Sequence, residues 1–118
     1  MKPGHETDPV DLFVYGTLMD NELVVQLTGH RFRKVSAILD GYRKEASVGG
    51  YARIVPDPDA HVEGEILQDV DRETLRTLDR YEDEGQLYRR TLVSVRVRGV
   101  PRPAWAYVGL PYLPKNCA

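Results

Sequence analysis

Most of this sequence has the pattern of short strands separated by turns, and only two stretches have a helical period. The run from residue 88 to 98 alternates apolar and polar side chains, which is typical of a strand with one solvated face. Strand-like patterns also occupy residues 11–15, 33–55 and 62–70, and Gly64 inside the last indicates a bulge or a close backbone approach. Many strands with few helices predict an α+β fold: a small antiparallel β-barrel or curled sheet with about two flanking helices.

Glycine and proline mark the turns between these strands. Asp-Gly at residues 40–41 and Gly-Gly at residues 49–50 divide the run 33–55 and predict hairpins. Pro-Asp-Pro-Asp at residues 56–59 predicts another turn. We expect Val-Pro-Arg-Pro at residues 100–103 to turn the chain into a last strand, which completes a hairpin.

Capping residues delimit the two predicted helices. The first helix follows the strand that ends at Tyr15, with Asp20 or Asn21 as its N-cap and Gly29 at its C-terminal end. The second helix follows Asp71, which is a suitable N-cap.

The length of 118 residues predicts one domain, residues 11–118, after a flexible N-terminal segment, residues 1–10. No stretch approaches the ~20 apolar residues of a membrane helix, and the start lacks the apolar core of a signal peptide. We therefore expect a cytoplasmic protein with no membrane partner, either a monomer or a weak homodimer.

The charge distribution gives no reason to expect a nucleic-acid partner, because the net charge is −2. Five arginines lie late in the chain, and alternate arginines on a strand indicate a solvated face rather than a phosphate-binding surface. They are Arg89, Arg90, Arg96, Arg98 and Arg102.

Glu82 is an acid on the apolar side of the second predicted helix. At ~100° per residue it falls between Leu75 and Leu78. Because an unpaired buried charge is costly, such an acid is paired, neutralised or kept for chemistry. Two interpretations stay open: a general acid and base, or an ion pair with Arg89 or Arg90. Burial would raise the pKa of Glu82 toward neutrality if those cations stay away.

Other polar groups also have two interpretations each. The backbone around Gly16 can hold an anion where a strand ends and a helix begins, or Gly16 makes the turn and Thr17 caps the next segment. Tyr88 and Tyr107 can orient a ligand through their hydroxyls, or belong to the core with the oxygen at its rim. Asp79 lies at the edge of the apolar arc and either supports the functional groups as a hydrogen-bond partner or lies at the surface, of which we expect the surface.

The sequence contains no pattern typical of a metal or cofactor site. His5, His30 and His61 are scattered, without an acid or cysteine at ligand spacing. Cys117 lies beside the C-terminus, which argues against a catalytic thiol. We therefore expect neither a metal nor a cofactor.

Four motifs, in their order and spacing, resemble the γ-glutamylcyclotransferase-like (AIG2-like) family over about residues 11–108. They are Val14-Tyr15-Gly16-Thr17-Leu18, His61-Val62-Glu63-Gly64-Glu65-Ile66, Leu78-Asp79-Arg80-Tyr81-Glu82 and Leu87-Tyr88-Arg89-Arg90. The gap from Glu82 to Tyr88 is most similar to that of the γ-glutamylaminecyclotransferase branch. One departure is Ala52-Arg53 after Tyr51, where many relatives have a proline, and we expect it to reshape the rim of the pocket.

This resemblance implies an enzyme that converts a γ-glutamyl amine or γ-glutamyl peptide to 5-oxoproline and a free amine. It makes Glu82 the catalytic acid and base, and its implied substrate-binding residues are Tyr15, Gly16, Thr17, Leu18, Tyr88 and Tyr107. One alternative is a noncatalytic AIG2-like domain for ligand binding or protein interaction, in which Glu82 would be tied to Arg89 or Arg90. Another is an amide hydrolase or acyl transferase, in which water or an external amine attacks.

Overall fold

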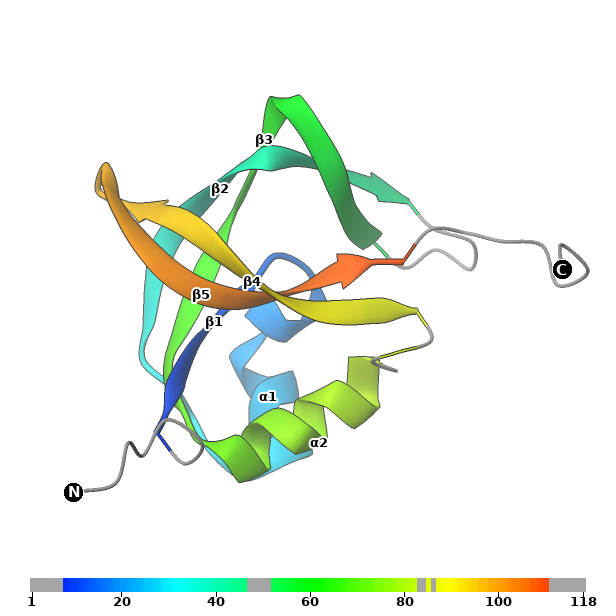
Figure 1. Cartoon of the computed structure of the whole chain (residues 1–118). Helices are drawn as coiled ribbons and strands as arrows, with labels where there is room; N and C mark the ends of the chain where they lie inside the picture. Colours follow the sequence, from blue (N-terminus) through cyan, green and yellow to red (C-terminus); the bar gives the residue numbers. More distant parts are fainter. Residues whose placement is uncertain (1–7, 47–51, 83–84, 86, 111–118) are drawn as a thin grey trace, which may run out of the picture.

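The computed structural model describes residues 8–46, 52–82, 85 and 87–110, in which five strands and two α-helices are connected by short segments (Figure 1). The elements are β1 (Val10–Val14), the 3₁₀ helix η1 (Thr17–Met19), α1 (Asn21–Thr28), β2 (Lys34–Ala46), β3 (Ala52–Val70), α2 (Arg72–Glu82), β4 (Tyr88–Val97) and β5 (Val100–Gly109). The turn expected at residues 49–50 and most of the expected N-terminal segment lie outside the described residues.

The five strands close into a barrel in the order β1-β3-β2-β4-β5, so the predicted α+β fold is confirmed. Four of the five strand pairs are antiparallel, and β1 runs parallel to β5, with Leu12 opposite Trp105. The parallel pairing of β1 with β5 follows from the odd number of strands. When direction alternates around a ring of five strands, the last strand points the same way as the first.

β2 and β3 form one long ribbon, which corrects two predicted turns. β2 continues through residues 40–41 with Gly41 at φ 87°, and β3 continues through residues 56–59. The register moves from Asp40 opposite His61 to Tyr42 opposite Pro56, so residues 57–60 have no partner on β2. The turn residues therefore produce a bulge, and the ribbon bends sharply there (Figure 1).

The β4–β5 hairpin turns earlier than predicted. Val97 is opposite Val100, and the two residues between them, Arg98 and Gly99, have φ of 52° and 80°. Positive φ at both positions is typical of the two-residue turns that join twisted strands. The prolines at 101 and 103 lie within β5, and their spacing of two places both missing N–H groups on the same edge of the strand.

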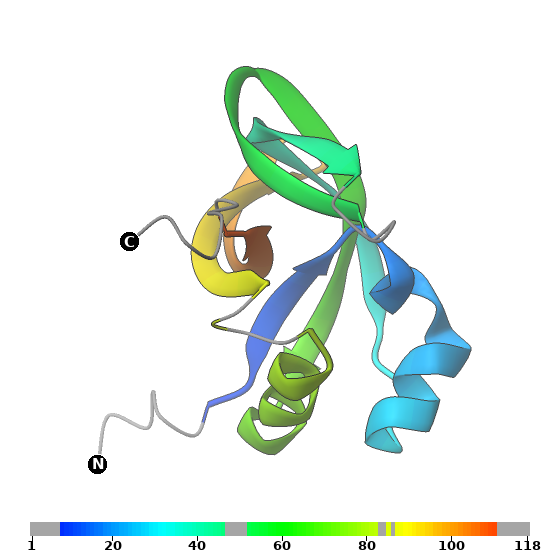
Figure 2. The same cartoon turned by 90° about the vertical axis from the view of Figure 1, so that its right-hand side faces the viewer.

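The helices lie side by side against one end of the barrel (Figures 1 and 2). The predicted ends of α1 are confirmed: the Asp20 carboxylate accepts hydrogen bonds from the amides of Glu22 and Leu23, and Gly29 ends the helix at φ 77°. α2 begins after Asp71, whose carbonyl accepts the amide of Leu75. Neither α-helix in the described part of the chain has the length and apolar character to cross a membrane.

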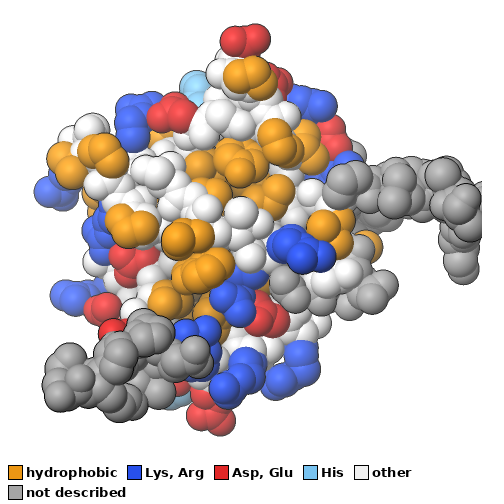
Figure 3. All heavy atoms as spheres, in the orientation of Figure 1, with side chains coloured by type: hydrophobic (Ala, Val, Ile, Leu, Met, Phe, Trp, Pro, Cys, Tyr) orange, Lys and Arg blue, Asp and Glu red, His pale blue; other side chains and the backbone are white. Residues whose placement is uncertain are grey.

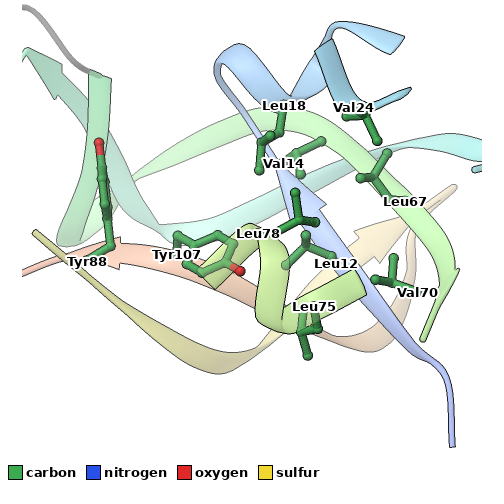
Figure 4. Packing of buried hydrophobic residues seen from close by; sticks show 10 residues of the cluster. All are labelled: Leu12, Val14, Leu18, Val24, Leu67, Val70, Leu75, Leu78, Tyr88 and Tyr107. Atoms are coloured by element: carbon green, nitrogen blue, oxygen red, sulfur yellow. The ribbon is translucent and has the colours of Figure 1, made fainter. Parts of the chain in front are cut away.

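Two apolar clusters form the core. One joins the helices to the barrel and includes Leu12, Leu75 and Leu78 (Figure 4). The other consists almost wholly of strand side chains and includes Phe13 and Ile66. Neighbouring residues of β1 point into different clusters because side chains alternate along a strand. β1 is therefore buried on both faces, and it carries the chain directly into the candidate site.

Candidate functional site

Gly64 fixes the position of the turn after β1. A Cβ atom at Gly64 would overlap the carbonyl oxygen of Val14 and would lie 2.8 Å from the ring of Phe13. The close backbone approach predicted at this glycine is confirmed. Because only a glycine fits here, β3 can pack against the last residues of β1 and set where Tyr15 begins.

The turn itself combines an exposed backbone with a buried anchor. Gly16 and Thr17 are exposed, while Leu18 is buried in the core beneath the helices. The hydroxyls of Thr17 and Tyr81 lie 3.2 Å apart, which joins the turn to α2 one residue before Glu82. The short helix η1, which begins at Thr17, was not among the predicted elements.

Glu82 is the last residue of α2 and is partly buried. Burial raises the pKa of its carboxyl from 4.5 to about 7. The charge of Glu82 helps to raise the pKa of Tyr15 and of Tyr107, so this carboxyl lies near both phenols. Among the ion pairs that join described residues, none involves Glu82. The predicted shelter of Glu82 and the direction of its pKa shift are confirmed.

Asp79 is not the surface residue that we expected. The guanidinium of Arg90 donates to both of its carboxylate oxygens, from Nε at 2.9 Å and from Nη2 at 3.1 Å. The hydroxyl of Tyr107 donates to Oδ1 of Asp79 at 2.6 Å. Arg90 also stacks on Trp105, 5.0 Å from the ring centre. The helical period alone placed Asp79 at the edge of the apolar arc. The side chains that cover it, Arg90 on β4 and Tyr107 on β5, come from strands distant in sequence.

Tyr15 and Tyr107 lie near Glu82, Tyr15 also lies near Tyr88, and we call these three tyrosines the tyrosine cluster. All three are buried, with 7%, 6% and 2% of their surface exposed. The hydroxyl of Tyr15 donates to the carbonyl of Tyr107 at 2.5 Å. The rings of Tyr88 and Tyr107 extend from neighbouring strands (Figure 4). The rings are therefore part of the core, and burial is the main reason that the pKa of Tyr15 and of Tyr107 is raised.

Arg53 also reaches this region, although we did not predict it as a site residue. Its guanidinium donates to the carboxylate of Glu45 at 3.0 Å and to the carbonyl of Leu110 at 2.6 Å. Its charge acts on Tyr15 in the direction that lowers the pKa. The departure at Ala52-Arg53 was the sequence signal that could have identified it.

A separate hollow of about 500 Å³ lies between β2, β3 and the turn of the β4–β5 hairpin. Its lining comprises Val35, Ser36, Ala37, Ile38, Glu63, Gly64, Arg96, Arg98 and Gly99. Apart from the packing glycine Gly64, its lining contains none of the candidate site residues described in this subsection. Within the described ranges, no group of three or more His, Cys, Asp or Glu residues is arranged to hold a metal ion.

The structure is that of an α+β protein: a five-stranded barrel with two helices at one end and a sheltered glutamate on the second helix. This chain belongs to the gamma-glutamyl cyclotransferase, AIG2-like family, whose model matches residues 12–117. The resemblance drawn from the four motifs is thereby confirmed.

Individual relatives support the same family. "AIG2-like protein C" of Arabidopsis thaliana is 38% identical over 86 residues, which are 72% of this chain and 49% of the relative. "AIG2-like protein A" of the same plant is 31% identical over 86 residues, 72% of this chain and 51% of that protein. The chain thus matches about half the length of these curated relatives.

Solved structures share the fold. A solution structure of an Arabidopsis thaliana protein superposes with a TM-score of 0.79 at 25% identity, covering 91% of this chain and 72% of the other. A structure named "Gamma-glutamyl cyclotransferase" superposes with a TM-score of 0.74 at 20% identity, covering 88% of this chain and 68% of that one. At that identity the second likeness concerns the fold alone.

Proposed function

We propose that this protein is a γ-glutamylcyclotransferase, which converts a γ-glutamyl amine or γ-glutamyl peptide to 5-oxoproline and a free amine. The observation that carries the proposal is the state of Glu82. It is a sheltered carboxyl without a cationic partner among the described residues, and its pKa of about 7 suits both proton acceptance and donation at neutral pH. Family membership supports the reaction class.

The reaction requires no covalent intermediate with the protein. Glu82 takes a proton from the α-ammonium of the γ-glutamyl group, and the freed amine attacks the γ-carbonyl of the same group. A carbon–nitrogen bond forms within the ring as the original amide bond breaks, and Glu82 returns its proton to the leaving nitrogen. The second proton that the ring nitrogen loses passes to the released amine, which departs as an ammonium ion. One carboxyl serves both steps, because the proton taken up equals the proton given back.

The turn after β1 would hold the substrate. Gly16 and Thr17 expose their backbone beside α2, and the contact between Thr17 and Tyr81 keeps the turn close to Glu82. Holding the α-amine near its own carbonyl favours a five-membered ring closure, whose effective molarity is large. The tyrosine cluster would wall the site and exclude water, which would otherwise compete with the amine.

The alternative of a noncatalytic interaction domain expected an ion pair between Glu82 and Arg89 or Arg90. Arg90 instead binds Asp79, and burial raises the pKa of Glu82. A carboxyl kept only for structure would be stabilised by a cation, because an unpaired sheltered charge lowers stability. We therefore favour the enzyme.

The test is product analysis with the variant Glu82→Gln. The amide has nearly the same size as the carboxyl but accepts no proton, so we expect substrate binding to persist and 5-oxoproline formation to fall by at least ~100-fold. The protein is incubated with a panel of γ-glutamyl amines and dipeptides, and the products are identified by mass spectrometry.

The matched control is Glu73→Gln, which makes the same change at an exposed position in the first turn of the same helix. This control should retain full turnover. Undiminished 5-oxoproline release by Glu82→Gln would reject the assignment. Free glutamate or a new amide as the product would indicate hydrolysis or acyl transfer instead.

A further inference from the structure

Asp79 is the point where α2 meets the β4–β5 hairpin. Its two carboxylate oxygens accept a forked pair of hydrogen bonds from Arg90 and a third hydrogen bond from Tyr107. The side chains of Asp79 and Arg90 are only 20% and 19% exposed. A forked, sheltered pair of this kind fixes its geometry far better than a surface ion pair does. The stacking of Arg90 on Trp105 restrains the guanidinium from a second direction.

The same pair lies within one helical turn of Glu82. Asp79 precedes Glu82 by three residues on α2, a spacing that places two side chains on the same face of a helix. The charges of Arg90 and Glu82 both act on the phenol of Tyr107, the first lowering its pKa and the second raising it. Burial raises the pKa of Glu82, and the guanidinium of Arg90 donates instead to Asp79.

We propose that Asp79 is a positioning residue for the reaction: it holds the Arg90 guanidinium against Trp105 and thereby keeps Glu82 free of a cationic partner. Its importance for turnover rests on the proposed function, whereas its control of Arg90 does not. Without Asp79, Arg90 would lose the carboxylate that accepts its forked pair of hydrogen bonds, on the helix face that also carries Glu82.

In the described part of the chain, the other ionisable groups near Glu82 do not compete for this role. Tyr15 and Tyr107 are neutral at pH 7, because burial raises the pKa of both phenols. Arg53 on β3 acts on Tyr15 and is itself paired with Glu45. Of the charged side chains that face this end of α2, Arg90 is therefore the cation that the loss of Asp79 would release.

Two substitutions should move the pKa of Glu82 in opposite directions. Asp79→Asn leaves Arg90 without its carboxylate, and a cation that turns toward Glu82 should lower that pKa by about one unit. Arg90→Met leaves the charge of Asp79 uncompensated beside Glu82 and should raise the same pKa. The double variant Asp79→Asn with Arg90→Met removes both charges and should restore a value close to that of the unmodified protein.

The measurement is an NMR titration of the Glu82 side-chain carboxyl in the full chain labelled with ¹³C-glutamate, with Glu82→Gln used for assignment. Glu73→Gln is the control and should leave the titration of Glu82 unchanged. Amide spectra show which variants fold. If Asp79→Asn does not fold, the proposal is tested by the upward shift of the pKa of Glu82 in Arg90→Met. An unchanged pKa of Glu82 in the folded single variants, or a shift that persists in the double variant, would overturn the proposal.

The titration needs no substrate, so the two proposals fail separately. Opposite shifts without any 5-oxoproline from the unmodified protein would reject the proposed function and keep the control of Arg90 by Asp79. If 5-oxoproline forms, the acidic limb of the pH–rate profile should move to lower pH in Asp79→Asn, and the double variant should reverse that move. 5-oxoproline formation with an unmoved acidic limb would reject the role of Asp79 alone.

Discussion

The carboxyl of Glu82 holds its proton to a higher pH than a free glutamate because the ionised form is deprived of water. Neither a carboxylate nor a cation among the described residues shares this effect, since burial is its one cause. A group in this state destabilises the fold when it ionises. The sheltered acid is therefore maintained against the stability of the protein, as expected for a group kept for chemistry.

This cost predicts a pH-dependent gain in stability for Glu82→Gln. The pKa of Glu82 is about 7 in the folded protein and 4.5 in its ordinary state, so the folded state binds the proton more tightly. The stability that comes from this proton is complete below pH 4.5 and is lost as the pH rises through 7. Above pH 8 the variant should therefore exceed the unmodified protein by about 1–2 kcal/mol, after allowance for partial exposure.

Urea denaturation at a series of pH values measures this difference. The gap between the two proteins should open between pH 4.5 and about 7.5 and then stay constant. A gap of the same size at pH 4 and pH 8.5 would mean that the substitution acts through packing and not through ionisation.

At the level of residues, the sequence predicted the inward direction of Glu82 but not the partner of Arg90. The helical period places Glu82 beside Leu75 and Leu78 without any tertiary information. Whether Arg90 pairs with Asp79 or with Glu82, both on α2, depends on where β4 passes α2. This is a non-local property. The same limit explains why Asp79 was expected at the surface.

Among the elements, β1 and β3 together set the site. Gly64 allows β3 to approach the carbonyl of Val14, one residue before the turn at Tyr15. An added methyl group here meets backbone, which cannot move aside as the end of a flexible side chain does. With β3 packed against β1 in this way, the turn at Gly16 and Thr17 lies beside the C-terminal end of α2.

The substitution Gly64→Ala should therefore destabilise the protein by about 2–4 kcal/mol, because a buried backbone contact is overpacked. The neighbouring change Glu63→Ala provides the control, since this side chain is 81% exposed and should alter stability by less than ~0.5 kcal/mol. Thermal unfolding followed by circular dichroism compares them. Equal midpoints for the two variants would contradict the close packing of β3 on β1.

The sequence predicted the elements better than their ends. Asp20 and Gly29 delimit α1 as expected, because caps act locally. Residues 40–41 and 56–59 carry turn-forming residues, yet the strands continue past them because the flanking residues still pair across β2 and β3. At Arg98-Gly99 the chain makes a tight turn that the sequence did not predict. Arg98 has a positive φ there, and arginine is not a residue type that indicates such a turn.

The whole molecule is held together by contacts between distant parts of the chain. β1 and β5, near opposite ends of the described chain, close the barrel, and Arg102 on β5 pairs with Asp11 on β1 at 2.8 Å. Of the late arginines that were expected to form a solvated face, Arg90, Arg96 and Arg102 have carboxylate partners. The sequence predicts a small antiparallel barrel or a curled sheet, whereas the parallel pairing of β1 with β5 that closes the barrel depends on all five strands together.

The outer surface carries some apolar side chains as well. They gather across the middle of one face (Figure 3), and on β4 and β5 the side chains of Leu92 and Val100 are 58% and 62% exposed. Exposed apolar side chains are common on protein surfaces. The monomer or weak homodimer, and the cytoplasmic location, stay predictions.

The central claim is that the assembled fold, and not the local sequence, brings Glu82 to a neutral pKa. Its most direct test is the ¹³C NMR titration of the Glu82 carboxyl in the unmodified protein, once folded and once in denaturing urea. We predict a midpoint at about pH 7 in the folded protein and near 4.5 in the unfolded chain. A folded-state midpoint that coincides with the unfolded one would contradict the account.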